Sequence, residues 1–466
     1  MPEFLDPLRA IVVGGGFSGT LVAIHLLRQP RAAQIELVDA RIPGRGLAYS
    51  TVWDDHLLNV PAIRMSVFGS EPMHFLEWLH ANGEPEADAG YFAPRKLYGT
   101  YLQHTLEAAV RAAGAKSILR HHVTEARRVW FDGEFAYAAL GNGETLRGSK
   151  VVLACGNPMP RPLVRILPGY VGSPWEAGAF ENIDPERDVL LVGSGLTAVD
   201  AFLALQAQGH RGKVYFLSRR GKLPQPHTPY PPLPEAFAPP GRLGARGLLR
   251  AIRRRVKDAQ AENVNWRAVI DSMRPVTNDI WRQLESREQR RVLRHLKTWW
   301  DIHRHRMAPD IGTKIADAKS CGRLVVHAGH LQHLTANDEG LTAVVRLRSQ
   351  EKMTLAVQRL INCTGSEEDY RNTENPLLRS LIASGCIVPH PIGKGLRTNE
   401  HGVVLDETGT ATEWLLTLGP PRLGGLFETT AVPEIRRQAE ALASYLMSVI
   451  YEPIEVMPEL FMAAGI

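Results

Sequence analysis

The stretch IVVGGGFSGT, residues 11–20, is an apolar run that ends in three glycines, with a fourth glycine three residues later. Gly14, Gly16 and Gly19 fit the G-x-G-x-x-G fingerprint of a strand–turn–helix unit that holds a dinucleotide. There the first glycine makes the tight turn, the second lets backbone amides approach a pyrophosphate, and the third lets the helix pack on the strand. Phe17 and Ser18 then begin a helix whose N-terminus faces the phosphates.

An acidic residue follows this loop at the expected distance. The predicted second strand, QIELVDA (residues 34–40), carries Asp39, which comes 20 residues after Gly19. A carboxylate at this position can accept hydrogen bonds from an adenosine ribose. Taken alone, Asp39 could equally be a solvated residue at a strand end. Together with the glycine loop, it predicts a dinucleotide site.

A second loop repeats the pattern in DVLLVGSGLTAVDAFLALQAQG, residues 188–209, where Ala198 replaces the third glycine. The following strand, VYFL (residues 214–217), ends in a serine and two arginines instead of an acid. Arginines at this position can pair with the 2′-phosphate that distinguishes NADP from NAD, although a surface pair is the alternative. This predicts NADPH, with NADH left open. The predicted NADPH-binding residues are Gly193, Gly195, Thr197, Ser218, Arg219 and Arg220.

Two dinucleotide folds in one chain suggest one cofactor that remains bound and one that binds and dissociates. A flavin can store the hydride that a nicotinamide delivers. We therefore expect FAD at the first loop. The segments VVLACGNP (151–158) and RLINCTGSE (359–367) each predict an apolar strand that ends in a glycine, Gly156 or Gly365, and both glycines are predicted to bind FAD. They resemble the crossings by which flavin oxidoreductases pass the chain between their FAD and NAD(P) domains.

The predicted fold is α/β, with two Rossmann-like dinucleotide-binding domains. The FAD domain is discontinuous, with residues 1–165 and 360–466, and the NAD(P) domain is inserted at residues 185–359. Within that insert, residues 223–240 are too rich in proline for a helix or a central strand. A helical insertion is predicted at 243–318, where it could cover the active site.

Composition excludes several classes of protein. The 466 residues include 54 Lys and Arg against 49 Asp and Glu, a balance too mild to indicate nucleic acid without a recognisable motif. The basic stretches at 247–260 and 287–306 are read first as solvated helical faces, with attraction of anionic cofactors or docking at a membrane surface as alternatives. We expect no membrane-spanning segment and a cytoplasmic location.

The cysteines and histidines predict no metal centre. The four cysteines show neither CxxC pairing nor metal-ligand spacing, so any redox chemistry must come from a bound cofactor. His303 and His305 are two residues apart on a predicted helix and cannot share one face as metal ligands do at i, i+4. We interpret the HRHR segment as structural or as facing a phosphate.

Five segments carry a likeness to a known family: GGGFSG (14–19), GRGLAYST (44–51), HLLNVPAIRMS (56–66), WWDIHRHRMAP (299–309) and LGPPRLGGLFETTAVPEIRRQA (418–439). They resemble the bacterial FAD/NAD(P)-binding flavoproteins that include the YdhS-type proteins and the aspartate N-hydroxylases.

The resemblance implies a path for FAD along these segments. It places the ADP half of FAD at the first glycine loop and Asp39. Asn59 and Met65 could equally be loop and core residues. Amides at a helix N-terminus near residue 431 could stabilise negative charge on a reduced flavin. Further positions implied along the cofactor toward the flavin ring are Arg45, Asn59, Met65, Gly425, Ala431 and Val432.

The leading functional expectation is a flavin monooxygenase of the N-hydroxylase type. NADPH would reduce FAD, and one atom of molecular oxygen would pass to a small amine or amino acid. The alternatives are an NAD(P)H-dependent flavin reductase or dehydrogenase without oxygen insertion, and a non-catalytic redox sensor.

No catalytic residue is identified from the sequence, and a homodimer is left open. Glu428 and Glu434 are interpreted as caps at a helix start. For an anionic substrate, arginines could grip a carboxylate. Arg64 and Arg304 are the candidates put forward, with Arg45 and Arg306 beside them.

Overall fold

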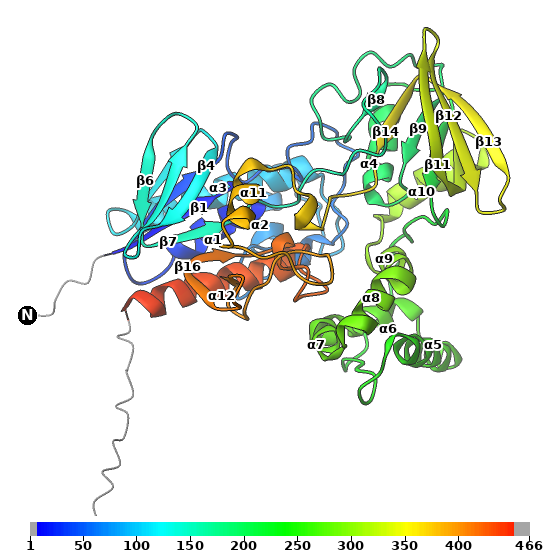
Figure 1. Ribbon diagram of the computed structural model, residues 1–466. Coiled ribbons are helices and arrows are strands. Elements are labelled where there is room, and N and C mark those ends of the chain that lie inside the picture. Colours follow the sequence, from blue (N-terminus) through cyan, green and yellow to red (C-terminus); the bar gives the residue numbers. More distant parts are fainter. Residues whose placement is uncertain (1–6, 452–466) are drawn as a thin grey trace, which may run out of the picture.

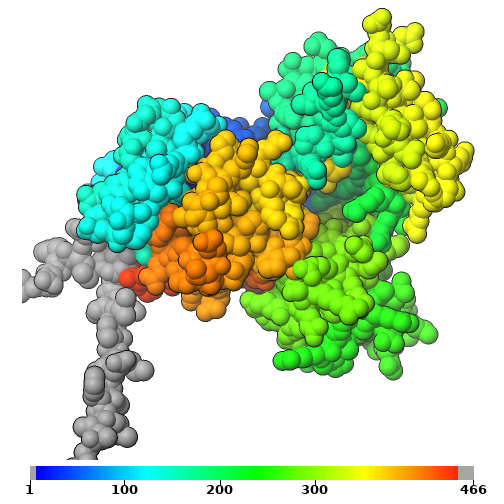
Figure 2. All heavy atoms as spheres, viewed as in Figure 1, coloured from blue at the N-terminus to red at the C-terminus, as the bar shows by residue number. Residues whose placement is uncertain are grey.

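The computed structural model describes residues 7–451, so the outermost parts of the predicted FAD domain, 1–6 and 452–466, lie outside the described residues. Two α/β lobes and a smaller helical lobe make up the molecule (Figure 1). In Figure 2 the green surface of the helical lobe meets the orange surface formed by residues near position 420. The predicted α/β class is confirmed, with two mainly parallel sheets that each carry a glycine-rich strand–helix turn.

The first sheet combines strands from both ends of the chain in the order β15-β16-β7-β1-β2-β3. Its strands pair in parallel except at the β15–β16 edge. Because β16 pairs with β7 next to β1, this lobe is discontinuous in sequence, as predicted. The strands are β1 (Leu8–Val13), β2 (Ala33–Val38), β3 (Ile118–His122), β7 (Lys150–Leu153), β15 (Val403–Leu405) and β16 (Ala411–Thr417).

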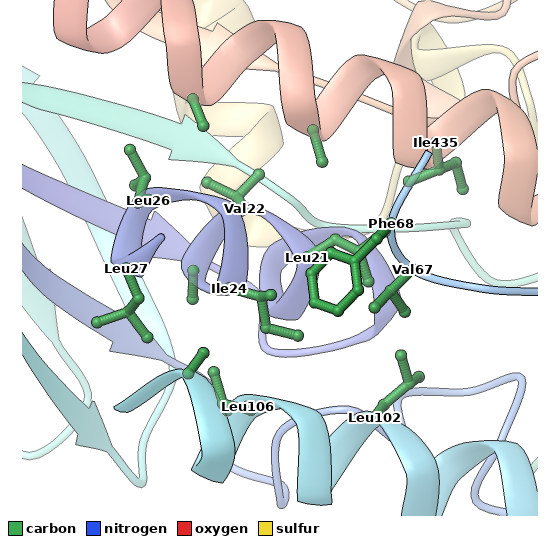
Figure 3. Packing of buried hydrophobic residues seen from close by; sticks show 14 of the residues in the cluster. Leu21, Val22, Ile24, Leu26, Leu27, Val67, Phe68, Leu102, Leu106 and Ile435 are labelled. Carbon is green, nitrogen blue, oxygen red and sulfur yellow. The ribbon is translucent and has the colours of Figure 1, made fainter. Parts of the chain in front are cut away.

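Helices cover one face of this sheet. Helix α1 (Phe17–Leu27) is apolar on nearly every side because it lies between α3 (Arg95–Ala113) and α12 (Val432–Tyr451). Figure 3 shows α1 in this position, with Val22 facing α12 and Ile24 facing α3. The chain between the first two of these helices adds η1 (Ala62–Arg64) and α2 (His74–Ala81).

The other face is covered by a small antiparallel sheet and α11 (Pro376–Ala383). Val129 and Ala138 of the small sheet share a core with Ile11 of β1 and Leu377 of α11. The small sheet consists of β4 (Ala126–Phe131), β5 (Ala136–Leu140) and β6 (Thr145–Gly148), and the short helices nearby are η4 (Tyr370–Asn372) and η5 (Pro420–Arg422).

The second sheet has the order β13-β12-β11-β10-β9-β14-β8. Five of its strands are parallel, and the antiparallel β12 and β13 extend one edge. Helix α4 (Leu196–Ala207) packs on it. The strands are β8 (Tyr170–Val171), β9 (Val189–Val192), β10 (Val214–Ser218), β11 (Leu324–Asn337), β12 (Gly340–Leu347), β13 (Lys352–Val357) and β14 (Arg359–Asn362).

The helical lobe lies between β10 and β11 in sequence, where an insertion is predicted. Residues 223–240 contain no helix or strand, as their prolines predict. The helices of the lobe are α5 (Ala245–Ala261), α6 (Trp266–Ser272), η2 (Arg274–Val276), α7 (Thr277–Gln283), α8 (Ser286–Arg291), a π-helical turn (Val292–Leu296) and α9 (Lys297–Arg304).

Three details of the organisation differ from the predicted boundaries. Helix α10 (Pro309–Ser320) belongs to the second α/β lobe, because Ile311 and Ile315 share a core with Val199 and Phe216. The chain enters the second sheet before residue 185, at β8, and leaves it after residue 360, at the end of β14. Each crossing follows an apolar strand. Sequence periodicity can identify such a strand, but it does not reveal which other strands it pairs with in the folded protein.

Candidate functional site

At two positions of the first glycine turn, Gly14 and Gly19, the structure leaves no room for a side chain. Gly14 has φ +106°, and a Cβ added there would lie 2.4 Å from the carbonyl oxygen of Ala154. A Cβ on Gly19 would lie 1.8 Å from the carbonyl oxygen of Gly14. Gly16 is the N-cap of α1, and no side chain caps that helix. The first amides of α1 therefore face outward at a positive helix end, which suits a phosphate.

Asp39 lies at the end of β2 beside this turn. Its Oδ2 accepts a hydrogen bond of 2.7 Å from the Gly15 amide, and its Oδ1 accepts one of 2.8 Å from the Arg41 amide. A carboxylate has about four acceptor positions, so it can still receive hydroxyl donors. Asp39 is thus both the residue that holds the turn and a candidate partner for a ribose.

A cavity of about 490 Å³ runs along this turn and the C-terminal ends of the strands. It continues to Pro420, Thr430 and Ile435 at the start of α12. A long groove with an uncapped helix N-terminus at one end and a second helix start at the other fits the elongated shape of FAD. The predicted FAD residues that line it are Gly14, Gly16, Phe17, Ser18, Asp39, Arg45 and Gly156.

The other predicted FAD residues lie elsewhere. Met65 is 1% exposed and belongs to the core, where its carbonyl accepts a hydrogen bond from Tyr98. The Asn59 carbonyl accepts a hydrogen bond of 3.1 Å from His227. Val432 is also a core residue. The positions that do not line the large cavity are Gly19, Asn59, Met65, Gly365, Gly425, Ala431 and Val432, and Gly19 acts by packing the helix against the strand.

The second glycine turn repeats the geometry of the first. Gly193 has φ +134°, and a Cβ there would lie 2.2 Å from the carbonyl oxygen of Cys363, just as Gly14 abuts Ala154. Gly195 is the N-cap of α4, with no side-chain cap and open space where a Cβ would be. Thr197 lies in the first turn of α4. Ser218 accepts a hydrogen bond of 2.7 Å from Ser194, which fixes the end of β10 against the turn.

The end of β10 opens into a cleft of about 420 Å³ with an unusual set of cations. Arg219 and Arg220 line it, and the helical lobe adds Arg294 and His295. Arg348 from the β12–β13 connection completes the set, with Thr298 and Trp299 beside it. Within residues 7–451, no carboxylate lines this cleft or pairs with its arginines. We call it the arginine cleft. Unpaired guanidinium groups at this place suit a phosphate.

A smaller cavity of about 50 Å³ adjoins the large one at the start of α12. Thr430 lines both cavities, and the neighbours Glu367 and Glu368 line the large and the small one respectively. We call the smaller cavity the chamber. Its lining residues are Lys297, His305, Glu368, Leu423, Phe427, Glu428, Thr430 and Ala431.

Two of the arginines predicted for a substrate carboxylate have internal partners instead. Arg304 pairs with Glu428, with 3.1 Å between Nε and Oε1. Arg306 is 1% exposed and pairs with Asp271. Neither guanidinium is free for a substrate, because each already pairs with a carboxylate of the protein. Arg64 is exposed in η1, where its predicted role stays a prediction, and Arg45 donates to Gln103 at 3.0 Å.

Comparisons with known proteins agree with this geometry. Residues 11–158 match the FAD-NAD(P)-binding family. This part of the chain is an FAD-NAD(P)-binding domain. The predicted likeness to FAD/NAD(P)-binding flavoproteins is thereby confirmed for the domain that contains the first glycine turn.

Longer matches cover most of the chain. An uncharacterized protein of Mycobacterium tuberculosis is 24% identical over 416 residues, which is 79% of this chain and 75% of that protein. The fold resembles that of a Kutzneria ornithine N-hydroxylase, solved with reduced FAD, NADP⁺ and L-ornithine, at TM-score 0.64 and 14% identity, covering 95% of this chain and 100% of that one. It also resembles an L-lysine 6-monooxygenase of Pseudomonas syringae, at TM-score 0.65 and 17% identity, covering 95% and 99%.

Several residues of the arginine cleft were missed by sequence reasoning. Arg294, His295 and Arg348 of the arginine cleft come from segments far from β10 in sequence. The basic stretch at 287–306 pointed toward Arg294 and His295, because attraction of anionic cofactors was one of the alternative interpretations of that stretch. The π-helical turn that carries Arg294 and His295 is a deviation often found at functional sites.

Three features are absent from the part of the chain that the structure describes. Among residues 7–451, no cluster of His, Cys, Asp and Glu could hold a metal ion, and none of the four cysteines forms a disulfide. The same residues contain no helix long and apolar enough to span a membrane.

Proposed function

We propose that this protein is an FAD-dependent oxidoreductase that takes hydride from NADPH and N-hydroxylates a small amine or amino acid with molecular oxygen. The observation that carries the proposal is the single cavity that joins the β1–α1 turn to the start of α12. It offers one continuous site for a cofactor with a phosphate-rich half and a ring half. The fold shared with an ornithine N-hydroxylase and a lysine monooxygenase supports the same class of reaction.

Each end of the large cavity has a distinct task in this proposal. Asp39 and the amides at the start of α1 would hold the ADP half of FAD. The N-terminus of α12, next to Thr430, would lie by the flavin ring and stabilise negative charge on its reduced form. When bound, FAD would accept the hydride from NADPH, and its reduced form would provide the chemistry for reaction with molecular oxygen.

The arginine cleft would give NADPH its preference over NADH. It lies at the end of β10, where the 2′-phosphate is expected once the pyrophosphate sits at the start of α4. Arg219 and Arg220 are the predicted partners, and Arg294 and Arg348 add two more guanidinium groups. Charge-assisted hydrogen bonds to a phosphate are each worth about 1.5–3 kcal/mol.

An anaerobic titration of the FAD-loaded protein with NADPH tests the proposal first. Bleaching of the flavin's visible absorption would support aligned nucleotide sites, and the amines are then screened in air for hydroxylamine products. Bleaching followed by NADPH oxidation without any hydroxylamine would indicate a flavin reductase or dehydrogenase. No bleaching with NADPH or NADH would contradict an enzyme that reduces its own flavin, and would favour a redox sensor.

A further inference from the structure

We infer that the chamber at the start of α12 receives the amine of the substrate and that His305 accepts the proton of its ammonium group. This inference rests on the proposed N-hydroxylation. The chamber is formed where the helical lobe meets the FAD-binding lobe, with Lys297 and His305 from one side and Glu368 and Glu428 from the other.

The position of the chamber fits the reacting end of a small molecule. It shares Thr430 with the large cavity, so it opens next to the proposed place of the flavin ring. A single water needs a cavity of about 10–15 Å³, so about 50 Å³ admits a few non-hydrogen atoms. That is room for a primary amine with its neighbouring carbon atoms. Phe427 and Leu423 supply apolar walls for those carbons.

The lysine and the two glutamates that line the chamber already form ion pairs with other side chains. Glu428 pairs with Arg304, and Glu368 pairs with Lys394. Lys297 donates to both oxygens of Asp301, at 2.8 and 2.9 Å. Burial opposes the charge on this lysine, but Asp301 and Glu368 outweigh it and raise the pKa of Lys297. None of these groups is free to act as a base, because the lysine keeps its proton and each carboxylate is already engaged by a cationic side chain.

His305 differs from them because its ring makes no hydrogen bond within the described residues. The nearest charged approach is 3.8 Å, from His305 Nε2 to Asp301 Oδ1. Burial lowers the pKa of His305, and Arg304 and Lys297 act in the same direction against Asp301 and Glu428. The imidazole is therefore neutral near pH 7, with a lone pair available in the chamber. Glu368, which also lines the chamber, completes the charged groups around it.

The proton transfer follows from the chemistry of amines. An alkylammonium ion has no lone pair with which to attack an oxygen atom, so it must first lose a proton. The N–H bond of the ammonium breaks, its electron pair stays on the amine nitrogen, and the proton forms a new N–H bond on the imidazole. Asp301, close to the ring, stabilises the imidazolium that results. Molecular oxygen, already part of the proposed reaction, supplies the oxygen atom.

The test compares full-length, FAD-loaded wild type with His305→Gln. His303→Gln is the matched control, because His303 is two residues away and its Nδ1 lies 2.7 Å from the Trp299 carbonyl, outside the chamber. Hydroxylamine product is measured between pH 6 and 10 with the twenty L-amino acids, putrescine and cadaverine. We expect His305→Gln to lose at least tenfold of the product rate at pH 7. It should come within twofold of wild type at pH 10, where solution supplies neutral amine. Anaerobic reduction of FAD by NADPH should stay within twofold in all three proteins.

A second measurement does not depend on turnover. It uses NMR of protein labelled with ¹³C at the histidine Cε1 atoms. The resonance of His305 is assigned as the one that is missing from the spectrum of His305→Gln. We expect that signal to move toward the imidazolium position when the amine that gives product is added, while the His303 signal stays in place. Product from His305→Gln at the wild-type rate and with the wild-type pH profile would overturn the role of His305 while N-hydroxylation stands. No hydroxylamine from wild type, despite reduction by NADPH, would overturn the proposed function and this inference with it.

Discussion

Arg304 of the helical lobe and Glu428 of the segment before α12 form a buried ion pair, with 3.1 Å between Nε and Oε1 and side chains 11% and 8% exposed. Trp300 donates a further hydrogen bond of 3.1 Å to the same carboxylate. A second pair, Arg274 with Glu434, lies 2.7 Å apart nearby. Two ion pairs therefore fasten the helical lobe to the start of α12, where the flavin ring is proposed to lie.

The first prediction concerns the coupling within the Arg304–Glu428 pair. Glu428→Gln leaves a buried guanidinium without its carboxylate, and loss of one partner of a buried pair costs about 3–5 kcal/mol. Arg304→Met together with Glu428→Gln should cost less than the two single changes added. We expect a coupling of about 1–3 kcal/mol from urea unfolding of the four proteins.

The matched control for this cycle is the Arg282–Asp279 pair of α7, whose side chains are 55% and 58% exposed. An exposed pair of this kind contributes about 0–1 kcal/mol. A coupling for Arg304 and Glu428 no larger than that of the control pair would mean that the pair does not fasten the lobes.

The second prediction separates the two glycine turns. Gly19→Ala places a Cβ 1.8 Å from the Gly14 carbonyl, so the helix must move off the strand. We expect this variant to lose FAD and to unfold at lower urea. Gly195→Ala meets no atom within 4 Å and should fold like wild type with FAD bound. Its methyl group fills space reserved for the visiting pyrophosphate, so the NADPH concentration for half-maximal flavin reduction should rise at least tenfold.

Flavin content after gel filtration, urea unfolding and anaerobic reduction measure these outcomes. Full FAD content in Gly19→Ala would contradict the steric argument for the first turn. Unchanged NADPH affinity in Gly195→Ala would contradict a nucleotide at the second turn.

Local sequence pattern predicted the two turns because their chemistry lies within a few residues. In both turns the first glycine lies so close to a neighbouring strand end, Ala154 or Cys363, that an added Cβ would clash, so one spacing rule applies twice. The same reasoning could not place α10, because the period of its apolar residues does not say which sheet they cover. It also left Met65 between cofactor and core, and the structure puts it in the core.

The chamber and most of the arginine cleft were beyond the reach of local pattern. His305 and Glu428 line one cavity although more than a hundred residues separate them in sequence. Arg294 and Arg348 meet Arg219 only because the helical lobe and the β12–β13 connection both fold back toward β10. Such sites depend on tertiary packing, and in a single sequence the residues that form them look like ordinary surface charges.

The third prediction concerns the choice between NADPH and NADH. Arg219→Ala and Arg294→Ala each remove one guanidinium group from the arginine cleft. No carboxylate among the described residues lines this cleft. Loss of one charge-assisted hydrogen bond of about 1.5–3 kcal/mol raises the NADPH dissociation constant by about 10- to 100-fold. NADH, which lacks the 2′-phosphate, should be affected less than threefold.

Anaerobic flavin reduction with each nucleotide measures this preference. Arg346→Ala is the control, since Arg346 lies on β12 near Arg348 but hydrogen-bonds Gln350 outside the cleft. Equal losses for NADPH and NADH in the cleft variants would contradict a 2′-phosphate site.

The fourth prediction uses His227 of the proline-rich segment. Burial, with Arg306 nearby, lowers the pKa of His227 from 6.5 to about 4, while its ring donates a hydrogen bond to the Asn59 carbonyl. Well above pH 6.5 this histidine is neutral in both the folded and the unfolded state. As the pH falls from 6.5 toward 4, the unfolded chain takes up the proton first, so up to about 3 kcal/mol of stability is lost.

His227→Gln keeps a donor for the Asn59 carbonyl but has no group that gains a proton in this pH range. Between pH 7.5 and pH 5, the urea midpoint of this variant should therefore fall less than that of wild type. The control is His330→Gln, at an exposed position on β11, whose urea midpoint should follow that of wild type. Parallel curves for wild type and His227→Gln would show that this buried imidazole does not set the acid sensitivity of the fold.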